Sequence, residues 1–163
     1  MVTASAVSPP LTEELVEYMA TGVDMIVATR DAALAPESML GMGIKVHPDR
    51  CTVTAYLPTE RAAATLRNLQ DNGQIAITLV HASTGKGIQL KGSVVSLRES
   101  DSSDRDLQAV FRSALVEELA AVGVPRSATR RLHWWPSTAV DVAVDSVFVQ
   151  TPGPKAGEPF KKA

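Results

Sequence analysis

Cationic and amide side chains suited to a phosphorylated heterocycle recur near the middle of the sequence. Lys45 ends one predicted strand, Arg61 lies in the first turn of a short predicted helix, and Gln89 lies on a long predicted strand. Phosphate groups bind charge-assisted donors and the free N–H groups at the start of a helix. These residue types predict a site for an anionic, planar ligand, although the same residues also suit an ordinary charged surface. Gly41 and Gly43 have two interpretations: they let the ring of a planar ligand approach the strand, or they relieve crowding inside the fold.

Other chemistries find little support in the spacing of the reactive residues. The segment from Ser83 to Gly87, STGKG, lacks the upstream glycine, the following Ser or Thr and the helix of a phosphate-binding P-loop. His47, His81 and His133 are too far apart to suggest a zinc site. Cys51 is more simply a small buried residue than a catalytic thiol. We therefore expect no metal site and identify no catalytic residue.

Composition narrows the class of protein. The chain has 163 residues, 45% of them hydrophobic and 21% charged, and a formal net charge of −2. These values are typical of a single globular domain without the basic field that binds nucleic acid. No apolar run approaches the length of a membrane span, and the N-terminus lacks the features of a signal peptide. We expect one domain over residues 1–150, a tail over 151–163 that packs poorly, and a cytoplasmic location.

Three helices and six strands are predicted from periodicity. The first helix spans residues 8–22, with Ser8 and Thr12 as candidate caps. The second is the short one that begins near Arg61 and ends at Asn72-Gly73, and the third runs to about residue 122. The acidic and hydroxyl residues 99–106 read as the solvated, capped entry of this third helix. The predicted strands are 23–29, 38–46, 52–57, 74–80, 87–97, which can bend at Gly92, and 139–150.

The order of these elements is α-βββ-α-ββ-α-β. Several strands follow each other through links too short for a parallel crossover, which indicates antiparallel pairing. Six antiparallel strands favour a closed or nearly closed barrel, because closure removes the exposed edges of a sheet. The helices would then plug or flank the barrel.

The span from about residue 23 to 95 resembles the pyridoxamine 5′-phosphate oxidase-like FMN-binding split barrels. The matching segments occur in family order: IVATRDAALAPE, MGIKVHPD, VTAYLP, TERAAATLRNLQDNGQIAITL and IQLKGSVVSL. The closing VDVAVDSVFVQTPGP is similar to the end of that group's short bacterial members. The resemblance implies a mostly β protein with flanking helices, built as a six-stranded antiparallel split β-barrel.

The resemblance also implies a cofactor and its contacts. Proteins of this family are homodimers that hold two FMN molecules in clefts between the subunits. A lysine-ended strand contacts flavin and phosphate, the next strand end and the short helix hold the phosphate, and a glutamine and a C-terminal tryptophan approach the ring. The matching positions in this chain are Met42, Gly43, Ile44 and Lys45, then Tyr56, Thr59 and Arg61, and finally Gln89 and Trp135.

Two departures from the family pattern concern the cations. Leu40 stands where the oxidase has an arginine, and Ala62 follows Arg61 where the oxidase has a lysine. The segment RRLHWW only superficially resembles the oxidase's substrate-binding RLHDR. These departures argue against pyridoxamine phosphate oxidase activity itself. Arg30 and Lys86 are the sequence-level candidates to supply the missing charge.

Three functions remain open at this level. The first is an FMN-dependent oxidoreductase of unknown substrate, which needs few catalytic side chains because the cofactor carries the chemistry. The second is a non-catalytic protein that binds flavin, haem or a deazaflavin, as other proteins of this fold do. The third is a dimeric scaffold with an empty cleft.

Overall fold

The computed structural model of the chain describes residues 10–160. Residues 1–9, which include the predicted cap Ser8, and residues 161–163 lie outside the described part. The elements in chain order are α1 (Glu13–Met19), β1 (Asp24–Arg30), β2 (Pro36–Leu40), β3 (Ile44–Val46), β4 (Thr52–Pro58), the 3₁₀ turn η1 (Thr59–Arg61), α2 (Ala63–Asn72), β5 (Gln74–Val80), β6 (Gly87–Glu99), α3 (Ser102–Ala121), α4 (Arg126–Arg130) and β7 (Ser137–Val149).

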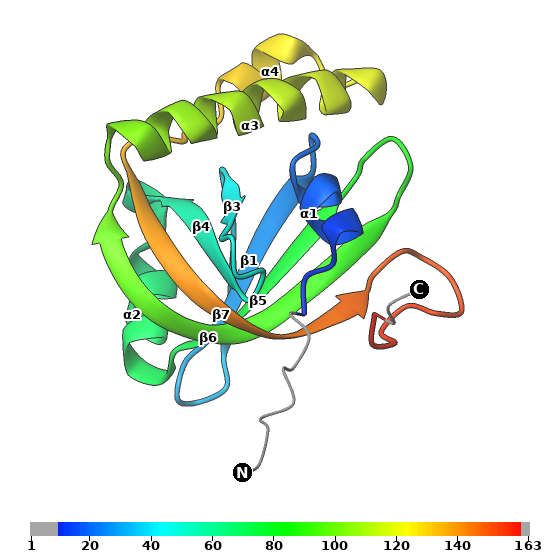
Figure 1. The fold of residues 1–163 in the computed structure, drawn as a ribbon. Helices are drawn as coiled ribbons and strands as arrows, with labels where there is room; N and C mark the ends of the chain where they lie inside the picture. Colours follow the sequence, from blue (N-terminus) through cyan, green and yellow to red (C-terminus); the bar gives the residue numbers. More distant parts are fainter. Residues whose placement is uncertain (1–9, 161–163) are drawn as a thin grey trace.

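The strands form one sheet in the order β2-β1-β5-β6-β7-β4-β3, and every neighbouring pair is antiparallel. The sheet curls around a core, with the long strands β6 and β7 side by side along one wall and α3 with α4 above them (Figure 1). The sheet does not close, because the edge strands β2 and β3 do not pair with each other. The predicted antiparallel β architecture is confirmed, whereas the predicted count of six strands is not, since the sheet has seven.

The extra strand arises because the predicted strand 38–46 is two strands. Residues 41–43 carry the chain across the open seam of the barrel, which we call the split. The Gly41 amide donates to the carbonyl of Met25 on β1, and the next amide, that of Met42, donates to the carbonyl of Tyr56 on β4, both at 2.9 Å. The chain thus leaves the ladder with β1 at Gly41 and joins β4 at Met42, so β2 and β3 lie at opposite edges of the sheet and form two strands.

The two glycines of this crossing have no room for a side chain. A Cβ on Gly41 would lie 2.5 Å from Cε of Met25. Gly43 has a φ of +150°, and a Cβ there would lie 3.0 Å from both Tyr56 and Gln108. The protein's own side chains therefore fill the space beside these glycines, as the crowding interpretation of the sequence predicts.

Helices α1 and α3 cover the ends of the core. Leu15, Tyr18 and Met19 form the apolar face of α1, and all three are buried. Phe111 and Leu115 of α3 enter the same hydrophobic cluster as the inward-facing residues of the sheet. Each helix is held by burial of one face, as expected for amphipathic helices in a globular fold.

The segment after β7 packs more closely than the sequence suggests. The Phe160 amide donates to the carbonyl of Val147 at 2.8 Å, and Val149 exchanges backbone hydrogen bonds with Gly157 and Glu158. The side chain of Phe160 packs against the hydrophobic core. Residues 151–160 therefore return to β7, and an aromatic anchor offsets the high content of Gly, Pro and Lys.

Removing this anchor should destabilise the fold measurably. For Phe160→Ala we expect a loss of about 1–2 kcal/mol in the free energy of unfolding, because a partly buried aromatic ring loses its apolar contacts. Chemical denaturation measures the change. Lys155→Ala, which alters an exposed residue of the same segment, should change the value by no more than about 0.5 kcal/mol. Equal stability of the two variants would contradict the packing role.

Candidate functional site

A pocket of about 260 Å³ opens beside the split. We call it the split pocket. Its walls come from β2, from the end of β4, from the last residue of η1 and from the segment that follows α4. The residues that matter for its chemistry are Glu37, Leu40, Met42, Arg61, Arg131 and His133. Two of the nine predicted cofactor residues, Met42 and Arg61, are thus brought together here.

Arg61 occupies the last position of η1, next to the start of α2. Its side chain is exposed, and no side chain caps the N-terminus of α2. Within α2, the hydroxyl of Thr65 is buried and has no hydrogen-bond partner among the described residues. The strand–turn–helix junction therefore offers an exposed cation and an uncapped helix start, which are the features that favour phosphate.

Arg131 and His133 were not predicted as site residues. They belong to RRLHWW, which follows α4, and reach the split pocket although Arg131 is 70 positions from Arg61 in the sequence. Nε2 of His133 lies 3.5 Å from the carboxylate of Glu60. The basic composition of the segment was visible in the sequence, but the tertiary contact that brings it to η1 has no local signal. The pocket thus gathers three basic side chains.

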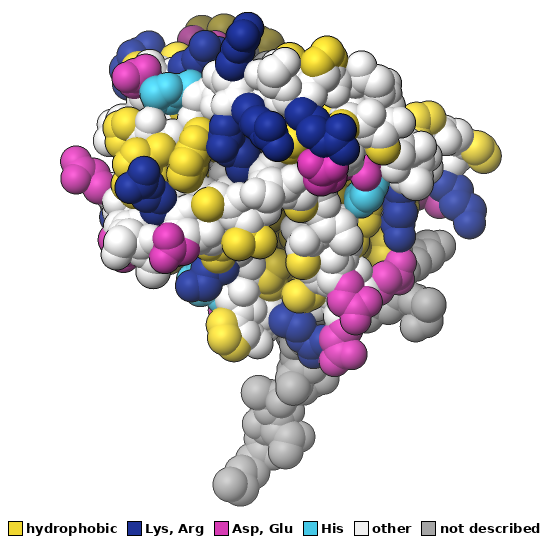
Figure 2. Space-filling model, turned by 90° about the horizontal axis from the view of Figure 1, so that it is seen from above, with side chains coloured by type: hydrophobic (Ala, Val, Ile, Leu, Met, Phe, Trp, Pro, Cys, Tyr) yellow, Lys and Arg dark blue, Asp and Glu magenta, His cyan; other side chains and the backbone are white. Residues whose placement is uncertain are grey.

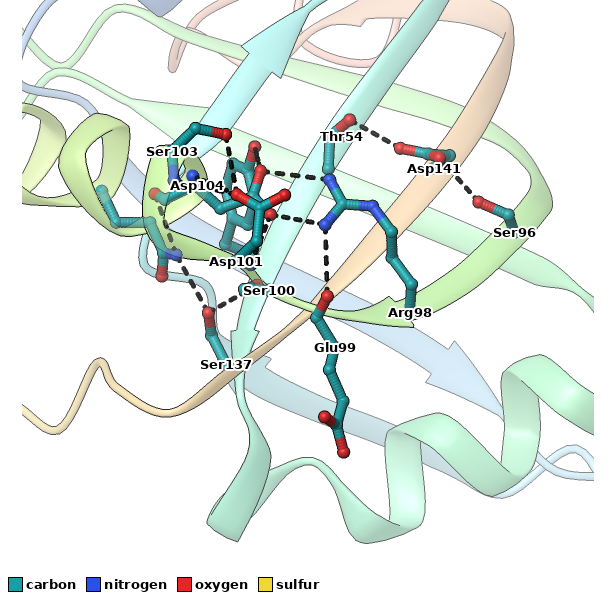
Figure 3. A network of polar contacts seen from close by, with 12 residues as sticks. Thr54, Ser96, Arg98, Glu99, Ser100, Asp101, Ser103, Asp104, Ser137 and Asp141 are labelled. Carbon is teal, nitrogen blue, oxygen red and sulfur yellow. Dashed lines mark hydrogen bonds and ion pairs between the residues drawn. The ribbon is translucent and has the colours of Figure 1, made fainter.

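Tyr56 lies beneath α3 and is fully buried. Its hydroxyl donates to Oδ1 of Asp104 at 2.7 Å. Arg98 of β6 donates to the same carboxylate at 2.5 and 3.1 Å (Figure 3), and the Asp101 amide donates to it at 3.0 Å. The tyrosine hydroxyl is therefore occupied within the protein, and Tyr56 is linked to the split pocket through its carbonyl, which accepts the hydrogen bond of the Met42 amide.

The pKa values of Asp104 and Tyr56 are shifted in opposite directions. Hydrogen bonds from Arg98 hold the pKa of the Asp104 carboxyl well below its usual range. Burial, and then the hydrogen bond to Asp104, raises the pKa of the Tyr56 hydroxyl above its usual value. The proton therefore stays on the tyrosine and the charge stays on the aspartate over the whole neutral range. The network fixes α3 on the sheet and does not exchange protons.

A second polar row continues along the same face of the sheet. Asp141 of β7 accepts hydrogen bonds from Thr54 and Ser96, both at 2.6 Å (Figure 3). Burial alone would raise the pKa of this carboxyl, but the two hydroxyl donors lower it on balance. His47 completes the row through a contact of 2.8 Å to Thr54. These groups tie β4, β6 and β7 to the turn that follows β3, and their donors and acceptors are already matched to each other.

Ile44 and Lys45 lie on β3, away from the split pocket. They line a separate groove of about 360 Å³ between α1, β3 and α3, together with apolar residues that include Phe111 and Val110. Ile44 is buried in the core and Lys45 is exposed. The amine of Lys45 is the one cation among the described residues that line this groove. Gly43 precedes them in the crossing segment.

The remaining predicted residues lie at three other places. The Thr59 amide donates to the carbonyl of Pro136 at 3.0 Å, which joins η1 to the start of β7. Gln89 on β6 donates to the hydroxyl of Thr78 at 2.9 Å. Trp135 packs near Trp134, and Arg105 of α3 lies 5.6 Å from the centre of its ring. A single protomer therefore does not gather all nine predicted residues into one pocket.

The candidates for the missing phosphate cation lie elsewhere. Arg30 donates to the side-chain amide of Gln74 at 2.9 Å and lines a different hollow on the sheet. Lys86 forms an ion pair with Glu14 at 3.2 Å. Neither lines the split pocket, so the expectation that they supply the charge is not supported. Arg131 lines the split pocket instead.

Residues 10–160 show neither a cluster of metal-binding side chains nor a helix suited to cross a membrane. No group of three or more His, Cys, Asp or Glu side chains is placed to hold a metal ion there. None of the helices in the same range has the length and apolar character needed to cross a membrane.

No protein-family model matches the sequence, and no curated protein matches it. Solved structures do match. HupZ from Group A Streptococcus is 20% identical, with 90% of this chain and 99% of that chain covered and a TM-score of 0.56. A putative pyridoxamine 5′-phosphate oxidase from Lactobacillus delbrueckii is 13% identical, with 88% and 97% covered and a TM-score of 0.55.

Other similar structures differ in the ligand that their names report. An FMN-binding protein from Syntrophomonas wolfei is 12% identical, with 83% of this chain and 86% of that chain covered and a TM-score of 0.53. An F420 reductase and the haem storage protein HutZ from Vibrio cholerae share the fold at 12% and 18% identity. At these identities the likeness concerns the fold alone. The resemblance to the pyridoxamine 5′-phosphate oxidase-like split barrels is confirmed at that level.

Proposed function

We propose that the chain forms a homodimer that binds FMN, or a related planar cofactor, and acts as an oxidoreductase on a small molecule. The observation that carries the proposal is the split pocket, which both Arg61 and Arg131 line, with Arg61 just before the uncapped start of α2. Arginine presents a rigid fork of donors that matches phosphate oxygens. Neighbours of the same fold include a protein that binds FMN. The position of Arg61 also matches the phosphate position implied by the sequence resemblance.

The size of the split pocket supports a site shared by two subunits. Its volume of about 260 Å³ is below the roughly 300–1,000 Å³ of pockets that enclose a drug-sized ligand. It suits the phosphate and part of the ribityl chain, so the flavin ring would extend beyond it. Lys45, Gln89 and Trp135 lie outside the pocket of their own protomer. A partner subunit would supply the second wall and bring residues of this kind to the ring.

The residues at the site have binding roles in this proposal. Arg61 and the N–H groups that begin α2 hold the phosphate, and Met42 forms the apolar floor beneath the ribityl chain. When bound, FMN supplies the hydride or one-electron chemistry. Tyr56, held by Asp104, keeps the floor of the site rigid. Leu40 and Ala62, which replace two cations of the oxidase pattern, argue against pyridoxamine phosphate oxidase activity itself.

Loss of Arg61 should weaken the binding of FMN. For Arg61→Ala we expect the dissociation constant to rise about 10- to 100-fold, because one charge-assisted contact to the phosphate is lost. Quenching of flavin fluorescence measures the constant. Arg67→Ala, which removes an exposed arginine from the neighbouring α2, is the matched control and should leave it unchanged. Equal affinities of both variants and the unaltered protein would remove the assignment.

Haem is the second candidate ligand. Nε2 of His133 is buried and forms no hydrogen bond within the part of the chain that the structure describes, and the Glu60 carboxylate, 3.5 Å away, would have to give way to a ligand there. An imidazole of this kind is a suitable axial ligand for haem iron, and a haem storage protein shares the fold. The absorption spectrum of the purified protein separates the alternatives: flavin bands support FMN, and a Soret band that is lost in His133→Ala supports haem. A colourless protein that binds none of them would support a scaffold.

A further inference from the structure

The cation missing from the start of α2 has a counterpart in the split pocket. Arg61 approaches the pocket from η1, and Arg131 approaches it from the segment after α4. We infer that Arg131 is a second phosphate-binding residue and that the two arginines together select phosphorylated over unphosphorylated ligands. The inference rests on the proposed function for the identity of the ligand, and the placement of the two arginines carries it.

The segment that holds Arg131 is fixed on both sides. The guanidinium of Arg112 on α3 donates to the carbonyl of Arg130, which anchors the end of α4. On the other side, the carbonyl of Pro136 accepts the hydrogen bond from Thr59 at the first position of η1. Arg131 therefore lies on a backbone segment tied directly to the turn that carries Arg61. Such preorganisation lowers the ordering cost of binding.

Aromatic contacts between these two anchors add rigidity. The guanidinium of Arg105 lies 6.0 Å from the ring centre of Trp134 and 5.6 Å from that of Trp135. The guanidinium of Arg112 lies 5.6 Å from the ring centre of Trp134. These arginines are occupied by the tryptophans, so the basic surface over α3 and α4 (Figure 2) is not uniformly available to a ligand.

Basic side chains outnumber carboxylates in the split pocket, so an anion bound there would offset the excess positive charge. Among the described residues, neither Arg61 nor Arg131 has a hydrogen bond or ion pair from its side chain. The imidazole of His133 faces Glu60, and Glu37 is the one carboxylate that lines the pocket. The two arginines line one pocket with a single carboxylate beside them, and a phosphate dianion bound there would accept donors from both.

The test compares FMN with riboflavin, which differ only in the phosphate. In Arg131→Ala we expect the dissociation constant of FMN to rise at least about tenfold and that of riboflavin to stay the same. Arg130→Ala removes the adjacent arginine, which is exposed and does not line the pocket, and should change neither. Arg131→Lys should recover part of the FMN affinity. A melting curve for each variant confirms that it is folded.

Calorimetric titration with inorganic pyrophosphate gives a readout that does not depend on flavin. If the unaltered protein binds FMN and Arg131→Ala keeps the FMN-to-riboflavin preference, the inference is overturned and the proposed function stands. If no flavin binds but pyrophosphate binds and Arg131→Ala weakens it tenfold, the cation pair stands and the proposed function falls. If neither flavin nor pyrophosphate binds the unaltered protein, both are overturned.

Discussion

Replacing Asp104 with alanine should lower the free energy of unfolding by about 3–4 kcal/mol. The carboxylate is only 4% exposed and accepts hydrogen bonds from Arg98, Tyr56 and the Asp101 amide. Its removal leaves the buried tyrosine hydroxyl without a partner and the guanidinium without its counter-charge, and each loss is costly. The guanidinium side of the pair is 43% exposed, so water compensates part of its loss. Urea denaturation at neutral pH measures the change.

Two further variants separate the contribution of the Asp104 hydrogen bonds from that of helix α3 itself. Asp106→Ala removes an exposed carboxylate of α3 and should cost no more than about 0.5 kcal/mol. Tyr56→Phe removes a single hydroxyl and should cost about 1 kcal/mol. An Asp104→Ala protein as stable as the Asp106→Ala protein would show that α3 is held by its apolar face alone.

The same network should give the stability a defined dependence on pH. Because the folded state holds the pKa of Asp104 below its ordinary value, the contribution of this carboxyl is fully present above about pH 4, its unfolded pKa. It is lost as the pH falls from there toward the depressed folded value. The stability difference between the unaltered protein and Asp104→Asn should therefore shrink as the pH falls from 7 to about 2.5. A constant difference would contradict ionic stabilisation.

The burial of Asp104 shows where sequence reasoning stops. Residues 99–106 were expected to form a solvated, capped helix entry, and the cap is confirmed, since Asp101 and Asp104 form a capping box. The second carboxylate of that box is nevertheless buried, because Arg98 near the end of β6 and Tyr56 on β4 converge on it. Local periodicity places a cap but carries no information about strands that meet it 48 positions away.

The strands with a regular period of two were predicted almost to the residue. The expected strand 74–80 is β5, and the expected strand 52–57 is one residue shorter than β4. The expected strand 38–46 was divided because Gly41 and Gly43 permit the crossing of the split, and sequence alone could only mark them as a weak point. Strand prediction succeeds where alternate residues enter one core and fails where the chain changes partners.

The sequence predicted Arg61 of the candidate site but not Arg131, because only Arg61 lies in a local sequence pattern. Arg61 follows from a strand–turn–helix pattern that lies within a dozen residues of sequence. Arg131 depends on α4, a helix of five residues too short for periodicity to reveal. The segment that carries it is joined to η1 by the His133–Glu60 contact and by the Thr59–Pro136 hydrogen bond. Arg61 of η1 can thus be found from local sequence, whereas the tertiary fold brings Arg131 to the same pocket.

Replacing Gly92 with alanine should be the most damaging single change in the sheet. Gly92 lies where β6 shifts its register against β7, and a Cβ there would lie 2.1 Å from the carbonyl oxygen of Ala143. The obstacle is backbone and not a flexible side chain, so the two strands must separate locally and lose ladder hydrogen bonds. We expect a loss of about 4 kcal/mol or more, which is at the upper end for a single substitution.

Thermal unfolding followed by circular dichroism measures this loss, and Ser93→Ala is the matched control. Ser93 is the next residue of β6 and is exposed, so its replacement should change the stability by no more than about 0.5 kcal/mol. If the Gly92 variant unfolds within about 1 kcal/mol of the unaltered protein, β6 is not bent there as the structure has it. The result matters for the site, because the bend lets one strand carry Gln89 beside β5 and Arg98 beneath α3. A straight β6 would remove the support that Asp104 and Tyr56 give to the floor of the split pocket.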